Sequence, residues 1–168
     1  NMLDKKFKDL DRLSSGFRKE YRLGRLDDRD LKKDPLDLFA AWFLEAVKNK
    51  EDKPNAMALA TAANGRPSAR MVLLKGFDES GFVFYTNYES PKAKDLLKKP
   101  AAEVLFYWTK LERQVRILGT VKKISRRESE TYFRSRPREA QIAAWISKQS
   151  SRVENRPTIN IIAEIKRA

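Results

Sequence analysis

The spacing of hydrophobic and polar positions predicts two helices in the N-terminal third of the chain. Residues 2–16 place Leu and Phe side chains on one face, and residues 18–35 follow as a charged connector without a regular period. In the next segment, Asp34 can cap a helix whose first position is Pro35. The apolar positions of that helix predict a core stripe of Leu36, Phe39, Phe43 and Val47.

Alternating apolar and polar positions then predict strands joined by tight turns. Residues 56–63 alternate, residues 64–67 have a turn sequence, and residues 70–87 indicate a hairpin around an Asp-Glu-Ser-Gly turn. A second strand pair is predicted over residues 101–125, with its turn near position 111.

Shorter helices are predicted after the strands. A Ser-Pro pair at 90–91 repeats the cap-and-proline pattern of a helix start. Ser125 and Glu128 have capping-box spacing and begin a helix that Pro137 stops, and further helices are predicted over 138–149 and at the C-terminal end. Strands that follow one another without intervening helical crossovers predict one mostly β domain, an antiparallel sheet or small barrel with peripheral α-helices.

Composition narrows the chemistry that such a domain can perform. The chain of 168 residues contains no His and no Cys, which excludes a Ser-His-Asp triad, a cysteine nucleophile and metals bound by these residues. No glycine-rich phosphate loop and no apolar run of about 18 residues is present. We therefore expect a cytoplasmic protein that, if it is an enzyme, relies on a cofactor and not on a metal or a catalytic side chain.

The charge balance predicts an anionic ligand. Lys and Arg number 36 against 23 Asp and Glu, a formal net charge of +13. Nucleic acid, an acidic membrane and phosphorylated small molecules would all be attracted by this excess. The basic residues are scattered among acidic ones instead of being gathered along one helix or arm, which makes nucleic acid the less favoured partner.

Two cations at the ends of one strand are the first candidate ligand-binding residues. Arg70 and Lys75 are five positions apart, about 16 Å in an extended strand and close to the length of an elongated phosphorylated cofactor. Strict alternation places them on opposite faces, so both reach one ligand only where a bulge or a strand end interrupts the pleat. Spacing alone favours the alternative, two solvent-facing cations at the ends of the strand.

A second candidate group follows the hairpin. Tyr85 and Thr86 close its second strand, and Lys92 stands at the start of a helix, where backbone N–H groups attract anions. The alternative is that Ser90 only caps the helix and that Lys92 is solvated.

Polar residues in the C-terminal half complete the set of candidate ligand-binding residues. Gln114 lies within a strand, where an amide needs a partner and can read a polar ring edge. Tyr132 and Arg136 share a helical face, and a polar run that includes Gln149 and Ser150 follows. An exposed turn before Gln114 and an exposed basic helix, which also admits RNA binding, are the alternatives.

Four motifs carry a resemblance to a known family. They are "RMVLLKGFDESGFVFYTN", "LERQVRILG", "YFRSRPREAQIAAW" and "SKQSSR", in this order and with short gaps. From about Arg18 to Arg152 the chain resembles the pyridoxine (pyridoxamine) 5'-phosphate oxidases, FMN enzymes with an antiparallel split β-barrel. The resemblance implies an N-terminal helical arm and substrate-covering segment at 1–33 and an FMN-binding split-barrel domain at 34–168.

The resemblance also implies residue roles around FMN at a homodimer interface. The implied cofactor-binding residues are Arg70, Met71, Val72, Leu73, Leu74, Lys75, Tyr85, Thr86, Lys92, Gln114, Gln149 and Ser150. The implied substrate-binding residues are Arg18, Lys19, Glu20, Tyr21, Lys75, Tyr132 and Arg136. Hydride would pass from C4' of pyridoxine or pyridoxamine 5'-phosphate to flavin N5, O2 would reoxidise the flavin, and no catalytic side chain would be required.

Three departures from the family pattern modify this expectation. Pro91 stands where the family often has Arg, and Ala140 stands where a Ser touches the substrate phosphate. Family members also continue past the end of this chain with final strands, a Trp and an Arg at the flavin, and an Arg-x-His pair at the substrate. We therefore expect FMN binding with weakened oxidase activity. An FMN-binding relative without oxidase activity is the first alternative, and a basic nucleic-acid-binding barrel is the second.

Overall fold

The computed structural model describes residues 26–27, 31–32 and 34–146, with the side chains of the last two residues left out. The predicted helix at 2–16 and the predicted C-terminal helix lie outside this range. The described elements are, in chain order, α2 (Pro35–Lys48), β1 (Ala56–Ala63), β2 (Arg66–Leu73), β3 (Gly76–Asp78), β4 (Gly81–Val83), α3 (Pro91–Lys98), β5 (Ala101–Trp108), β6 (Arg113–Thr120), α4 (Arg126–Ser135) and α5 (Arg138–Ile146).

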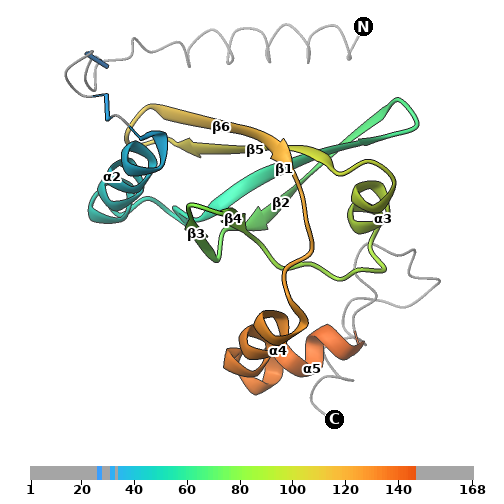
Figure 1. Cartoon of the computed structure of the whole chain (residues 1–168). Helices are drawn as coiled ribbons and strands as arrows, with labels where there is room; N and C mark the ends of the chain where they lie inside the picture. The colour runs from blue at the N-terminus through green and yellow to red at the C-terminus, as the bar shows by residue number, and fades with distance from the viewer. Residues whose placement is uncertain (1–25, 28–30, 33, 147–168) are drawn as a thin grey trace, which may run out of the picture.

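The centre of the fold is a four-stranded antiparallel sheet with the strand order β2-β1-β5-β6. A separate two-stranded sheet is formed by β3 and β4. Figure 1 shows α2 and α3 at opposite ends of the larger sheet, with α4 and α5 lying together away from it. The prediction of a mostly β, antiparallel fold with peripheral helices is confirmed.

Alternation along the strands gives the larger sheet one buried face. In β1 the buried side chains are Met57, Leu59 and Thr61, and β5 buries Ala102, Val104, Phe106 and Trp108. From α2, Phe39 packs onto this face with its ring centroid 5.1 Å from that of Phe106. The small sheet closes the core, because Phe77 and Phe82 each meet Phe39 edge-on at 4.9 Å.

The side-chain caps predicted for α2 and α4 are present, but the stripe predicted for α2 is partly wrong. Asp34 accepts a hydrogen bond from the backbone N–H of Leu36 at 2.7 Å, and Pro35 begins the helix. Val47 is 48% exposed, whereas its neighbour Ala46 is fully buried. The sheet therefore contacts the face that includes Phe39 and Ala46, and the small Ala side chain lets the last turn approach closely.

The predicted hairpin at 70–87 is also divided differently. The turn before it contains only Asn64 and Gly65, both with positive φ, so β2 begins earlier than predicted, at Arg66. β2 then ends at Leu73, and the backbone N–H of Lys75 donates to the carbonyl of Val83 at 2.8 Å. The beginning of the first strand predicted for this hairpin thus belongs to the four-stranded sheet, and only its end, β3, pairs with β4.

The outer face of the four-stranded sheet exposes large apolar side chains. The exposed fractions are 65% for Met71, 42% for Leu73, 58% for Tyr107 and 79% for Leu118. The register connects these positions across the sheet, since Ala58 lies opposite Met71 and Glu103 lies opposite Leu118. An apolar face of this kind is typical of an interaction surface.

We predict that Arg113 stabilises the packing of α2 against the sheet. Its guanidinium forms an ion pair with Glu45 and lies 5.0 Å from the ring centroid of Trp42, both on α2. Arg113→Ala should lower the free energy of unfolding, measured by urea denaturation, by about 1 kcal/mol. The control is Arg126→Ala, which removes an exposed pair with Glu130 and should cost less than about 0.5 kcal/mol. Equal effects of the two changes would contradict this role.

Candidate functional site

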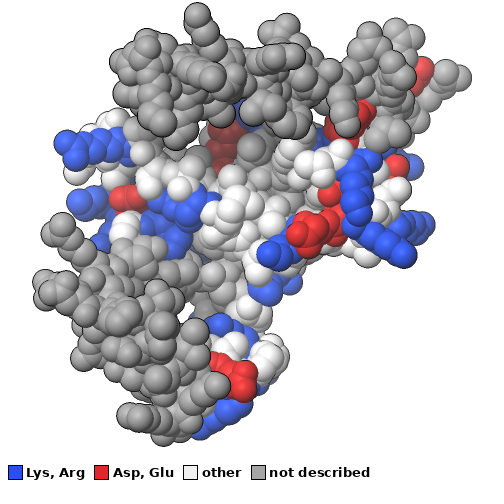
Figure 2. Space-filling model, turned by 180° about the vertical axis from the view of Figure 1, so that it is seen from behind, with Lys and Arg blue, Asp and Glu red and all other residues white. Residues whose placement is uncertain are grey.

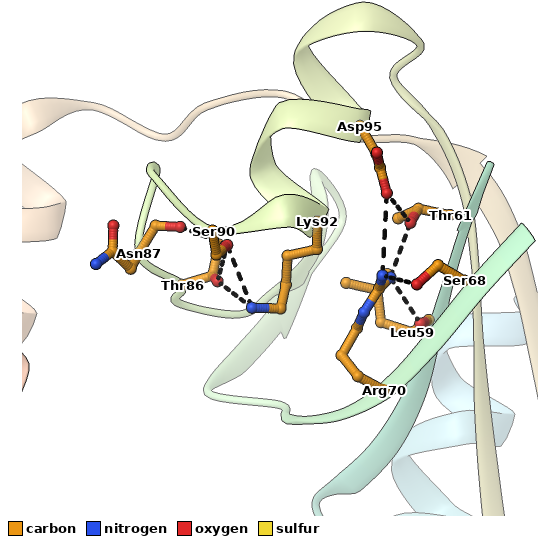
Figure 3. A network of polar contacts seen from close by, with 9 residues as sticks. All are labelled: Leu59, Thr61, Ser68, Arg70, Thr86, Asn87, Ser90, Lys92 and Asp95. Carbon is orange, nitrogen blue, oxygen red and sulfur yellow. Dashed lines mark hydrogen bonds and ion pairs between the residues drawn. The ribbon is translucent and has the colours of Figure 1, made fainter. Parts of the chain in front are cut away.

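Arg70 is held near the end of α3 by groups from three elements. Its Nη1 donates to the carbonyl of Leu59 at 3.2 Å and to Oγ1 of Thr61 at 2.8 Å. Its Nη2 donates to Oγ of Ser68 at 2.7 Å and lies 4.0 Å from the carboxylate of Asp95. The side chain is only 19% exposed (Figure 3). Arg70 is therefore a partly buried, fixed cation and not the solvent-facing cation that spacing alone favoured.

Lys92 supplies a second cation from the first turn of α3. The residue is 3% exposed, and its ammonium donates to Oγ1 of Thr86 at 3.1 Å and to Oγ of Ser90 at 3.2 Å. Burial lowers the pKa of Lys92, and the nearby positive charge of Arg70 lowers it further. Lys92 is thus not the solvated side chain of the alternative interpretation.

The N-terminus of α3 lies beside these cations. Ser90 is its N-cap residue, but the Ser90 hydroxyl donates to the carbonyl of Asn87 at 2.6 Å and makes no capping bond to the helix. Helix N-termini attract anions through their N–H groups and the helix dipole. Arg70, Lys92 and the start of α3 therefore form a cationic cluster in which Asp95 is, among the residues that the structure describes, the one carboxylate that contacts Arg70.

Tyr85 and Tyr132 form a second cluster together with Lys75. The two rings stack with centroids 3.6 Å apart and an interplanar angle of 6°, which joins α4 to the segment after β4. The ammonium of Lys75 lies 5.8 Å from the centre of the Tyr132 ring. Burial raises the pKa of the Tyr85 phenol, and Glu128 and Tyr132 add smaller contributions. The structure thus brings together three residues that the sequence analysis placed in separate candidate groups.

The break between β2 and β3 meets the condition under which Arg70 and Lys75 could both contact one ligand. Strand β2 ends at Leu73, so Lys75 lies beyond the regular pleat. Because strict alternation of side chains holds only within a regular strand, two residues five positions apart can contact one ligand when a strand end lies between them. Between them, Val72 and Leu74 point to the core, whereas Met71 and Leu73 lie on the outer face.

Two further predicted site residues that the structure describes, Gln114 and Arg136, lie elsewhere than predicted. Gln114 is exposed and lies on β6, the edge strand opposite β2, so its amide is not the buried group that the sequence suggested. Arg136 follows the last residue of α4 with extended backbone angles, which places it just beyond the helical face of Tyr132. The predicted residues Arg18, Lys19, Glu20, Tyr21, Gln149 and Ser150 lie outside the described residues.

Sequence reasoning missed three residues that contact Arg70: Thr61, Ser68 and Asp95. Thr61 carried a recognisable signal, because it is a polar residue at a core-facing position of an alternating strand. Asp95 carried no such signal, because its hydrogen bond with Thr61 joins residues that are 34 positions apart in the sequence.

Within the described part of the chain, no cluster of acidic residues has the arrangement of a metal site. Among the same residues, no helix is long and apolar enough to cross a membrane.

Comparison with known proteins defines first the fold class and then the family. The chain is similar to PhzG from Burkholderia lata 383, solved in complex with tetrahydrophenazine-1-carboxylic acid, with a TM-score of 0.79 and 24% identity over 86% of this chain and 72% of that one. A pyridoxamine 5'-phosphate oxidase-related, FMN binding protein from Nostoc punctiforme matches with a TM-score of 0.61 and 20% identity over 79% of this chain and 73% of that one. These likenesses establish the split-barrel fold.

The family follows from the sequence matches. The family model described as pyridoxamine 5'-phosphate oxidase matches residues 43–165. The pyridoxine/pyridoxamine 5'-phosphate oxidase of Paraburkholderia phymatum is 54% identical over 144 residues, which are 85% of this chain and 68% of that protein. The oxidase of Polynucleobacter asymbioticus is 52% identical over 83% of this chain and 67% of that protein. The chain belongs to the pyridoxamine 5'-phosphate oxidase family and spans about two thirds of the length of these relatives.

We predict that Lys92 makes the stability of the ligand-free chain depend on pH. The folded-state pKa is lowered from 10.5, so between the lowered value and 10.5 the unfolded chain binds more protons at this position. The contribution of Lys92 to the free energy of unfolding should therefore increase as the pH rises through this range. The measurement is urea denaturation of the wild-type chain and of Lys92→Met between about pH 7 and pH 10. The difference, wild type minus variant, should rise with pH, and a flat or falling difference would contradict the prediction.

Proposed function

We propose that this chain binds FMN and forms the cofactor-binding part of an oxidase that converts pyridoxine or pyridoxamine 5'-phosphate to pyridoxal 5'-phosphate. The observation that carries the proposal is the pair of partly buried cations, Arg70 and Lys92, beside the N-terminus of α3. Family membership supports the activity, and the names of the most similar relatives support the substrate class.

The residues of this cluster fit a phosphate group. Thr86 and Ser90 hold the Lys92 ammonium with two of its three protons, so one proton remains for an anion. Arg70 keeps its Nε proton and one Nη2 proton free of hydrogen bonds to the described residues. Each charge-assisted hydrogen bond to phosphate is worth about 1.5–3 kcal/mol, so several together account for micromolar or tighter binding.

The second cluster fits the substrate's phosphate or the edge of its ring. Lys75 follows the strand that carries Arg70, and Tyr132 presents an aromatic face beside the Lys75 ammonium. When bound, FMN supplies the acceptor for the hydride from C4', and O2 takes the electrons from it. The side chains of this chain then have to bind, orient and neutralise charge, in agreement with the absence of His and Cys.

We further propose that the chain functions as a homodimer through the outer face of its four-stranded sheet. This face exposes Met71 and Leu73 of β2, the strand that also carries Arg70. Gln114 lies at the opposite edge of the sheet, at least three strand spacings or about 14 Å from β2. A second copy on this face would let Gln114 of one protomer serve the cofactor held by the other.

The alternatives have less support. A flavin-binding protein without oxidase activity agrees with Pro91 and Ala140, which replace two phosphate-contacting side chains of the family pattern. Nucleic-acid binding rests on the net charge and on aromatic residues among the cations. Figure 2 shows one side of the molecule, on which basic side chains are interspersed with acidic and neutral ones and form no continuous stripe.

The test of cofactor binding is titration of the full chain with FMN, followed by flavin fluorescence. We expect a dissociation constant in the micromolar range or below, weakened about tenfold or more by Arg70→Ala because a charged phosphate contact is lost. The matched control is Arg126→Ala, which removes an exposed cation on α4 and should leave the affinity unchanged. Pyridoxal 5'-phosphate formation by the loaded chain then separates an oxidase from a flavin-binding relative. Equal affinities of the Arg70 and Arg126 variants would contradict the site.

The test of the dimer is sedimentation of two matched variants. Leu118→Glu places a charge on the outer sheet face and should shift the chain toward the monomer, because an apolar contact would have to bury an unpaired carboxylate. Leu44→Glu is the control, since Leu44 is 59% exposed on α2, away from that face. A monomeric wild-type chain, or equal behaviour of both variants, would contradict the proposed interface.

A further inference from the structure

The hydroxyl of Thr61 lies between Arg70 and Asp95. Its Oγ1 accepts a hydrogen bond from Arg70 Nη1 at 2.8 Å and donates to Asp95 Oδ2 at 3.0 Å (Figure 3). Thr61 is 3% exposed on the core-facing side of β1. The three residues come from β1, β2 and α3, so this chain of contacts joins the sheet to the helix that carries Lys92.

The direction of these two hydrogen bonds follows from the chemistry of the groups. A guanidinium can only donate, and an ionised carboxylate can only accept. The single proton of the Thr61 hydroxyl must therefore point to Asp95, which leaves the oxygen lone pairs for Arg70. Asp95 thus fixes the orientation in which Thr61 receives the guanidinium.

The contacts also decide which part of Arg70 remains available. The carbonyl of Leu59 and the hydroxyl of Thr61 take both Nη1 protons, and Ser68 takes one Nη2 proton, while Asp95 lies 4.0 Å from Nη2, beyond hydrogen-bonding distance. The Nε proton and one Nη2 proton are left. A planar guanidinium held through Nη1 keeps its remaining donors in a fixed orientation, which reduces the entropy lost when a phosphate binds.

We propose that Thr61 is a positioning residue for cofactor binding, which holds the Arg70 guanidinium so that its remaining protons meet the phosphate. This inference rests on the proposed function and adds a residue that does not touch the cofactor. In this role Thr61 acts through Arg70, so we expect its effect to be confined to the part of the affinity that comes from the phosphate.

The test compares FMN with riboflavin, which lacks the phosphate, in two pairs of variants that differ only in the hydroxyl. The pairs are wild type against Thr61→Val and Thr61→Ser against Thr61→Ala. Within each pair, loss of the hydroxyl should reduce the ratio of the riboflavin to the FMN dissociation constant about tenfold. Riboflavin binding should change less than about twofold, because riboflavin has no phosphate for Arg70 to bind. If the Val variant does not fold, the Ser and Ala pair provides the same comparison.

A double-mutant cycle separates positioning from a general structural effect. In an Arg70→Ala background, Thr61→Val should cause no further change in FMN affinity, because the residue through which it acts is absent. The inference is overturned if the wild-type chain binds FMN but the hydroxyl-free variants weaken FMN and riboflavin by the same factor. It is also overturned if the effect of Thr61→Val persists without Arg70. Absence of FMN binding by the wild-type chain overturns the proposed function and this inference together.

Discussion

The proposed site depends on holding two like charges close together inside the protein. Arg70 and Lys92 are both largely withdrawn from water, and burial, followed by the positive charge of Arg70, lowers the pKa of Lys92. Hydroxyl groups of Thr61, Ser68, Thr86 and Ser90 accept hydrogen bonds from them, and Asp95 is the carboxylate beside Arg70. An arrangement of this kind leaves positive charge uncompensated, and a bound phosphate compensates it.

The fold supplies this arrangement through three elements that meet at one end of the sheet. The tight turn at Asn64 and Gly65 sets β1 and β2 in register, which places Leu59 opposite Arg70. The segment after β4 then leads into α3, whose first turn brings Lys92 to the same place. The core aromatic cluster around Phe39 holds the small sheet against the large one and so fixes where this segment begins. Packing far from the cations therefore helps to place the segment that leads to Lys92.

The sequence predicted the features of this protein that depend on local chemistry. Asp34 and the Ser125–Glu128 capping box begin helices as expected, and the alternation in 56–63 gives β1 its buried face. The exposure of Val47 could not be predicted, because a stripe of apolar positions does not show how far a helix is rotated against its sheet. The contact of Thr61 with Asp95 was missed for a similar reason. Their contact depends on how α3 packs against β1, and no local pattern encodes that packing.

The cationic cluster is tested most directly by a crystal structure of the full chain grown with FMN. We expect the phosphate oxygens within hydrogen-bonding distance, about 2.7–3.2 Å, of the Lys92 ammonium and of Nε or Nη2 of Arg70. Nη1 of Arg70 should retain its bonds to Leu59 and Thr61. A phosphate bound away from both cations, or an Arg70 side chain that has left Thr61 to reach it, would contradict the site described for this chain.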